Sequence, residues 1–151
     1  MKDKPPQCEK IYLAANLFHS DFCLLVIGID ESSNALVFEE VNSDSLEEFK
    51  AVLELYSSHY KTNIWMYRDD VLEKELKNCR ISSIQSCSKY DALAIVTDSL
   101  LSKKKIQIES SLPLRRKLKE FKGENPPSSV LSLYCAVEKL QGRLNNDRQS
   151  M

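Results

Sequence analysis

Three apolar runs lie close together near the N-terminus and are separated by short polar connections. They span residues 11–15, 23–29 and 35–41, and the turn Asp-Glu-Ser-Ser-Asn separates the second run from the third. Apolar runs of this length with turn residues at their ends predict β-strands. Because short connections place sequential strands side by side in opposite directions, the three runs predict an antiparallel meander.

The pattern then changes to a helical period. Ser45 and Glu48 have the spacing of a capping box at the start of a helix. Apolar residues recur every three or four positions from there to Tyr60. These observations predict a helix over residues 45–60. The short apolar run that follows, residues 63–67, predicts a buried strand parallel to the first strand.

The remainder of the chain alternates between helical and strand patterns. Capping signals and apolar residues at helical spacing predict helices, and short apolar runs predict strands. In chain order these are a helix over residues 70–76, a strand over 81–85, a helix over 88–101, a strand over 106–108, a helix over 113–121 and a last helix over 129–140 with Gly142 as its stop.

Three antiparallel strands followed by alternating helices and strands predict an α/β fold with a mixed sheet flanked by helices. A right-handed crossover places the helix over residues 45–60 on one face of that sheet. We expect residues 10–144 to form a single domain, since the chain is long enough for one core. Residues 1–9, with their Pro5-Pro6 pair, are expected to form a flexible arm, and residues 145–151 a disordered tail.

Composition indicates a protein of a reducing compartment. Hydrophobic residues make up 42% and charged residues 28%, which is ordinary for a globular protein. The five cysteines are an odd number without a C-x-x-C pair, so a disulfide framework or zinc site is not expected. No apolar run approaches the ~18 residues of a membrane span, and no signal-peptide pattern is seen at the N-terminus. We therefore expect a cytoplasmic protein without membrane contact.

The net charge is −1, but the charges are unevenly distributed. Residues 30–54 hold eight acids and one lysine, whereas residues 103–122 hold eight basic residues and two acids. Such a basic region can attract phosphate, although a solvated helix face has the same composition. The basic residues are Lys103, Lys104, Lys105, Arg115, Arg116, Lys117, Lys119 and Lys122.

The order of elements and their local sequence resemble the C-terminal nuclease domain of phage large terminases. The similarity is carried by the first strand ending at Asn16, the following His-Ser-Asp21, the strand Leu-Leu-Val-Ile-Gly-Ile-Asp30, and Leu-Val-Phe-Glu-Glu-Val41 with the helix after it. It extends over nearly the whole chain after residue 9. The resemblance implies a ribonuclease-H-like fold, in which the three-stranded meander comes first.

The resemblance also implies where a metal site would lie. In that family carboxylates hold two divalent metals that activate water and stabilise the leaving oxygen. The corresponding positions fall on Asn16, on Tyr67 and on the first turn of the last helix, at Ser132. All three are neutral, so the resemblance implies that the catalytic acids are lost and that the domain has no metal cofactor and no enzymatic activity.

An alternative hypothesis is an active nuclease whose metal-binding acids lie at other positions. Asp21, Asp30 and Asp69 lie near the ends of the strands concerned and are candidate ligands for Mg²⁺ or Mn²⁺ in a DNA endonuclease. Each is equally a turn or helix-capping residue that bonds local backbone.

The interpretations lead to different partners. A terminase-nuclease-like domain without catalysis would grip DNA through the basic region, bind a packaging or other protein, or be the remnant of an integrated phage. A third hypothesis is an accessory protein whose acidic region, residues 30–54, meets a basic partner.

Overall fold

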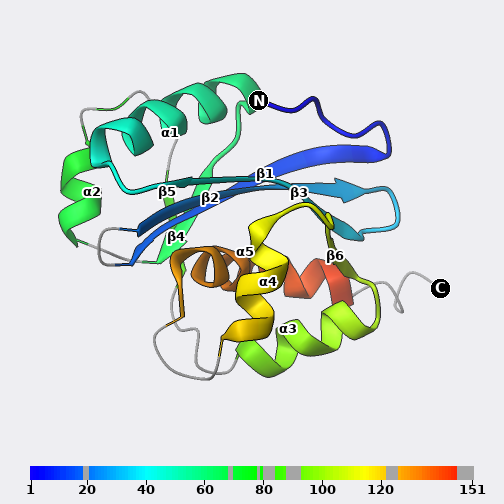
Figure 1. The fold of residues 1–151 in the computed structure, drawn as a ribbon. Helices are drawn as coiled ribbons and strands as arrows, with labels where there is room; N and C mark the ends of the chain where they lie inside the picture. Colours follow the sequence, from blue (N-terminus) through cyan, green and yellow to red (C-terminus); the bar gives the residue numbers. More distant parts are fainter. Residues whose placement is uncertain are drawn as a thin grey trace.

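The structure is a computed structural model that describes residues 1–18, 21–67, 70–77, 79, 84–87, 93–121 and 126–145. Over these residues the centre of the fold is a six-stranded mixed sheet in the order β5-β4-β1-β2-β3-β6 (Figure 1). The strands are β1 (Cys8–Phe18), β2 (Asp21–Asp30), β3 (Ala35–Ser43), β4 (Ile64–Tyr67), β5 (Ile84–Cys87) and β6 (Ile106–Ile108). The helices are α1 (Leu46–Tyr60), α2 (Asp70–Leu76), α3 (Leu93–Ser102), α4 (Pro113–Glu120) and α5 (Ser128–Asn145).

The pairing of the strands confirms the predicted α/β fold. β1, β2 and β3 form an antiparallel meander. β4 is parallel to β1, β5 is parallel to β4, and β6 is parallel to β3 at the opposite edge. The mixed sheet therefore has three antiparallel strands at its centre and parallel strands at both sides.

Helices cover both faces of the sheet (Figure 1). α1 and α2 pack on one face, where Phe49, Leu53 and Leu72 belong to one buried apolar cluster. α3, α4 and α5 pack on the other face, where Leu114 and Val137 belong to a second cluster. We call these clusters the α1-side core and the α5-side core. α1 lies on one face of the sheet, as expected.

The N-terminal segment contacts the rest of the fold. β1 begins at Cys8, two residues before the expected domain start. The backbone N–H of Lys2 donates to Glu39 at 3.0 Å, and the Tyr60 hydroxyl donates to the Lys2 carbonyl at 2.8 Å. These contacts tie the segment to β3 and α1. The expected tail lies outside the described residues from residue 146 onward, as does the start of the predicted strand over residues 81–85.

The predicted end of the last helix is wrong. α5 continues through Gly142 to Asn145 instead of stopping there. A glycine inside a helix costs only about 1 kcal/mol relative to alanine, and the turn before it is fixed by buried Val137 and Leu140. Neither α5 nor any other helix of the described residues is long and apolar enough to cross a membrane.

A β-bulge at Phe38 decides which way the end of β3 faces. Val26 pairs with Glu39 and Ile27 pairs with Val37, so Phe38 is an extra residue without a partner in β2. Val37 belongs to the α5-side core and Phe38 to the α1-side core. Glu39 remains on the α1 side, where it accepts a hydrogen bond from Tyr56. Because the bulge shifts the alternation by one residue, the next side chain, that of Glu40, faces α4 and α5.

Candidate functional site

The ends of β1 and β4 and the first turns of α5 meet at a buried asparagine. Asn16 is 3% exposed. Its Oδ1 accepts a hydrogen bond from the Tyr67 backbone N–H at 2.8 Å, and its Nδ2 lies 3.2 Å from Ser132 Oγ and 3.3 Å from Cys135 Sγ. The structure therefore brings together Asn16, Tyr67 and Ser132, the three positions that the terminase resemblance indicated.

Strand register explains why these distant residues meet. β1 and β4 are parallel, with Leu13 beside Ile64, so their carboxyl ends lie at the same edge of the molecule. Asn16 pairs with Cys23 of β2, and the Ser132 hydroxyl donates to the Cys23 carbonyl at 3.2 Å. Hydrogen bonds therefore connect α5 to β1 and β2 at this point. We call Asn16, Cys23, Tyr67, Ser132 and Cys135 the Asn16 cluster.

The Asn16 cluster is electrically neutral at neutral pH. Burial raises the pKa of the Tyr67 phenol and of the Cys23 and Cys135 thiols well above their usual values, because the charged form loses solvation. The Asn16 amide and the Ser132 hydroxyl do not ionise in this range. Mg²⁺ and Mn²⁺ need anionic oxygens to offset their charge. The donor set of the Asn16 cluster does not fit such an ion.

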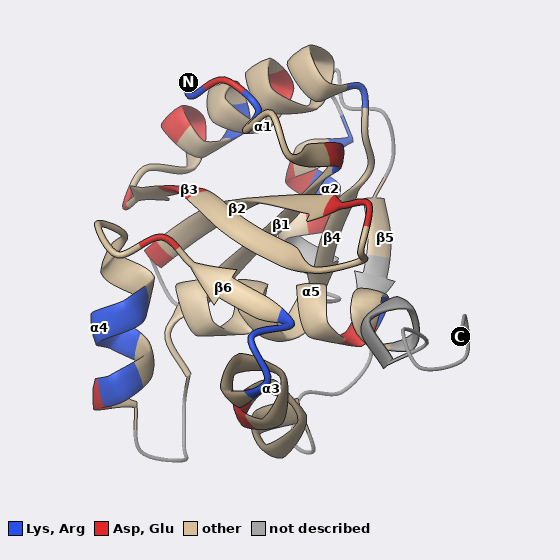
Figure 2. Ribbon diagram, turned by 90° about the vertical axis from the view of Figure 1, so that its right-hand side faces the viewer, with Lys and Arg blue, Asp and Glu red and all other residues tan. Residues whose placement is uncertain are grey.

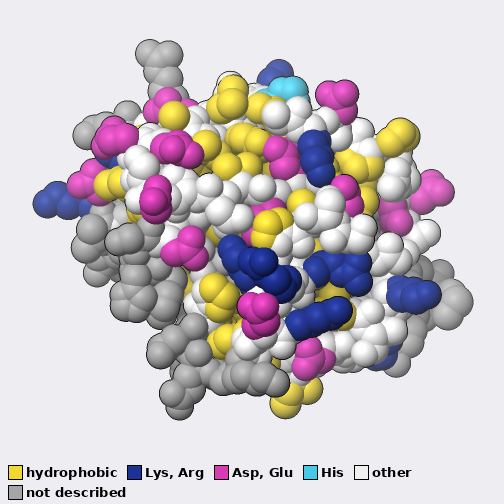
Figure 3. Space-filling model, viewed as in Figure 1, with side chains coloured by type: hydrophobic (Ala, Val, Ile, Leu, Met, Phe, Trp, Pro, Cys, Tyr) yellow, Lys and Arg dark blue, Asp and Glu magenta, His cyan; other side chains and the backbone are white. Residues whose placement is uncertain are grey.

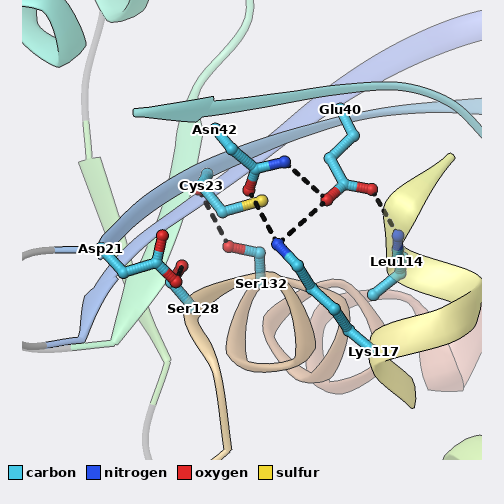
Figure 4. Close-up of polar contacts among 8 residues, drawn as sticks. All are labelled: Asp21, Cys23, Glu40, Asn42, Leu114, Lys117, Ser128 and Ser132. Carbon is cyan, nitrogen blue, oxygen red and sulfur yellow. Dashed lines mark hydrogen bonds and ion pairs between the residues drawn. The ribbon is translucent and has the colours of Figure 1, made fainter. Parts of the chain in front are cut away.

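Asp21, one of the alternative acids, lies beside the Asn16 cluster. It stands two residues before Cys23 in β2 and therefore on the same face of the sheet. The Ser128 hydroxyl, in the first turn of α5, donates to Asp21 Oδ2 at 2.8 Å (Figure 4). A carboxylate at a helix N-terminus is favoured by the helix dipole. Asp21 therefore holds the start of α5, a long-range contact that the turn interpretation did not anticipate.

Asp30 and Asp69 do not join Asp21 in the described part of the site. Asp30 is at the opposite end of β2, nine residues away, which corresponds to about 30 Å of strand. Its Oδ1 accepts from the backbone N–H groups of Ser32 and Asn34, both at 2.9 Å, as expected of a turn residue. Asp69 lies outside the described residues. Within those residues, no group of three His, Cys, Asp or Glu side chains is placed to hold a metal ion.

A second polar cluster, which the sequence did not indicate, surrounds Glu40. The Glu40 side chain is 0% exposed. Its Oε1 accepts from the Leu114 backbone N–H at 2.7 Å, and its Oε2 accepts from Asn42 Nδ2 at 2.8 Å and lies 3.8 Å from Lys117 Nζ (Figure 4). The ammonium of Lys117 also donates to Asn42 Oδ1 at 3.4 Å. We call these residues the Glu40 cluster.

The Glu40 carboxylate acts as a helix cap supplied by another element. The residue before α4, Leu112, has no side chain that can accept a hydrogen bond from the first turn. Glu40 supplies that acceptor from β3 and places a negative charge at the positive end of the helix dipole. One signal in the sequence could have revealed it. Glu39 and Glu40 are adjacent within the apolar run of β3, so both acids face covered surfaces once helices pack on the two sides of the sheet.

The basic residues predicted to bind nucleic acid come from two neighbouring segments. Lys103, Lys104 and Lys105 form the turn between α3 and β6, and Arg115, Arg116, Lys117 and Lys119 lie on α4 (Figure 2). Figure 3 shows lysine and arginine side chains gathered over α4 and the adjoining surface. The exposure of these side chains differs. The exposed ones are Lys103, Lys104, Arg115, Arg116 and Lys119. Lys105 is partly buried, Lys117 belongs to the Glu40 cluster, and Lys122 lies outside the described residues.

No protein-family model and no curated protein matches the chain. Solved structures do. A large terminase from a thermophilic bacteriophage matches with a TM-score of 0.68 at 13% identity, over 93% of this chain and 41% of that one. The large terminase nuclease of the thermophilic phage G20c, solved with bound zinc, matches with a TM-score of 0.64 at 16% identity, over 90% of this chain and 84% of that one.

A second class of protein is also similar. The yeast mitochondrial Holliday junction resolvase Ydc2 matches with a TM-score of 0.53 at 13% identity, over 97% of this chain and 87% of that one. At these identities the similarity establishes the fold. The chain has the ribonuclease-H-like α/β fold of phage terminase nuclease domains, and the expected resemblance is confirmed at that level.

Proposed function

We propose that this chain is a terminase-nuclease-like domain that binds DNA without cutting it. The observation that carries the proposal is the Asn16 cluster, where neutral groups meet at the position indicated by the resemblance to terminase nucleases. Two-metal cleavage depends on carboxylates that hold the ions and lower the pKa of bound water. Asn16, Tyr67 and Ser132 offer no anionic oxygen for either task.

The geometry of the alternative acids supports the same conclusion. A shared ion requires carboxylates within a few ångströms of one another. Asp21 is engaged with Ser128, and Asp30 lies at the far end of the same strand. Asp21 and Asp30 are therefore too far apart to hold the same metal ion.

A cleavage assay tests the absence of catalysis. Supercoiled plasmid incubated with the purified chain and Mn²⁺ is expected to show no nicking beyond an EDTA control, measured by agarose gel electrophoresis. The reason is that the Asn16 cluster cannot bind and charge-compensate the metal. Metal-dependent nicking that disappears in the Asp21→Asn or Asp69→Asn variant would contradict the proposal and support the alternative nuclease.

DNA binding is the part of the proposal that rests on the basic region. The solved neighbours are named as a terminase nuclease and a Holliday junction resolvase, and this chain presents exposed cations on α4 and in the α3–β6 turn. Cation–phosphate contact with release of counterions supplies most sequence-independent affinity for DNA. Lys117 contributes less than its neighbours because its ammonium already lies against Glu40 and Asn42.

A salt titration tests this interface. If about four exposed cations contact phosphates, the logarithm of duplex affinity should fall with the logarithm of salt concentration with a slope of about −3.6. The double variant Lys103→Glu/Arg116→Glu should weaken binding about tenfold or more and flatten the slope. Lys139→Glu, an exposed site on α5, is the matched control and should have little effect. Absence of duplex binding at low salt would contradict the DNA part of the proposal and leave the cleavage result unaffected.

A further inference from the structure

A groove of about 620 Å³ opens between α3, β6 and α4. β6 forms its base, and the two helices form its walls. In Figure 2 β6 lies at the front of the molecule, with α4 on one side and α3 below. The groove is separate from the Asn16 cluster, none of whose residues line it.

The backbone of β6 is open toward this groove. Among the described residues β6 pairs with β3 alone. The Lys105 carbonyl accepts from Ala35 at 2.8 Å, and the Glu109 N–H donates to Val37 at 3.0 Å. Because backbone groups of a parallel strand alternate in direction, residues 105, 107 and 109 face β3. The N–H and C=O groups of Ile106 and Ile108 therefore point to the open edge, where another strand can pair.

The walls next to this edge are apolar. Leu101 of α3, Ile108 of β6 and Leu118 of α4 are partly exposed and pack on the α5-side core. An occupant that covers them must itself present an apolar side chain. None of the described residues lining the groove is aromatic, so an unstacked nucleic-acid base has no stacking platform there.

The charges of the groove select an acidic occupant. Lys104, Arg115 and Lys119 line it, and Asp98 is the acid among its described lining residues. Three cations and one anion leave a formal charge of +2. Complementary charge steers and orients a partner of the opposite sign.

We propose that this groove binds an extended acidic peptide of a partner protein, which adds as a strand beside β6. Main-chain hydrogen bonds to Ile106 and Ile108 provide pairing, the apolar walls take one or two aliphatic side chains, and flanking carboxylates meet the three cations. β6 is three residues long, so the paired segment covers about 10 Å. The inference does not depend on the proposed function, although peptide and DNA would compete for the same cations.

The test uses the full chain and a fluorescein-labelled peptide with blocked ends, Glu-Asp-Ile-Glu-Val-Asp-Glu. Fluorescence anisotropy should show saturable binding with a Kd below about 1 mM. Amide hydrogen exchange at Ile106 and Ile108 should slow about fivefold or more when the peptide is bound, because both N–H groups become paired. A peptide with N-methyl groups on alternate amides should bind about tenfold more weakly, since it lacks those pairing groups.

Charge-reversal variants separate the groove from general attraction. Arg115→Glu/Lys119→Glu should weaken peptide binding about tenfold or more, whereas Lys139→Glu, outside the groove, should weaken it less than about twofold. Thermal unfolding would confirm that both variants are folded. The inference is overturned if the peptide does not bind at about 1 mM, if N-methylation does not matter, or if a single-stranded oligothymidylate protects Ile106 and Ile108 while the peptide does not.

Discussion

Replacing Glu40 by alanine is expected to lower the free energy of unfolding by about 3–5 kcal/mol. The Glu40 side chain is fully buried, accepts hydrogen bonds from the Leu114 N–H and Asn42 Nδ2, and forms an ion pair with the Lys117 ammonium at 3.8 Å. Truncation leaves the first turn of α4 without an acceptor and Lys117, which is 23% exposed, without its carboxylate. Unmade hydrogen bonds to buried groups cost more than the same bonds contribute when made.

Urea denaturation followed by circular dichroism measures this effect. Glu31→Ala, at an exposed turn after β2, is the matched control and should change stability by less than about 0.5 kcal/mol. A double-mutant cycle with Lys117→Met should give a coupling energy of about 1 kcal/mol or more. If Glu40→Ala is as mild as Glu31→Ala, the carboxylate does not hold α4 to the sheet.

Replacing Asn16 by aspartate is expected to lower the free energy of unfolding by about 3 kcal/mol at neutral pH. The carboxylate keeps the acceptor for the Tyr67 N–H but loses the two contacts made by Nδ2, to Ser132 and Cys135. It also brings a charge into a site that is 3% exposed and otherwise neutral. The variant should remain without Mn²⁺-dependent nicking, because Tyr67 and Ser132 still provide no anionic oxygen.

The pH dependence of this variant has a definite sign. Burial raises the pKa of an aspartate in the folded state above its unfolded value of about 3.9. Below the unfolded pKa the aspartate is protonated in both the folded and the unfolded state, so the loss of unfolding free energy relative to the original chain should be smallest there. It should grow as pH rises through the unfolded pKa and level off above the folded pKa.

The comparison is made from urea denaturation of variant and original chain at each pH. Gln7→Glu, an amide-to-acid change at an exposed position, should show no such pH-dependent difference. Equal stability of the Asn16→Asp variant and the original chain across the range would mean that the Asn16 site accommodates a negative charge. The expected destabilisation would then be wrong, whereas the proposed absence of cleavage, which rests on the neutral donor set of the Asn16 cluster, would be tested by the nicking assay alone.

Local patterns were sufficient for most of the fold. The three apolar runs predicted β1, β2 and β3, and the stripe after Ser45 predicted α1, because alternation and helical period depend on residues close in sequence. The Ser45 hydroxyl accepts from the Glu48 N–H at 3.3 Å, as its spacing predicted. The end of α5 was missed because the packing of Val137 and Leu140 outweighs the local preference of Gly142.

The amino-acid sequence by itself determined the order of elements, the ribonuclease-H-like resemblance and the neutral residues at Asn16, Tyr67 and Ser132. Only the tertiary structure decided that these three meet, since they are brought together by strand register and by the packing of α5. It also decided the role of Glu40. The bulge at Phe38 places Glu40 on the α5 side of the sheet. Local periodicity cannot predict such a one-residue insertion, because the insertion depends on how β3 pairs with its neighbouring strand.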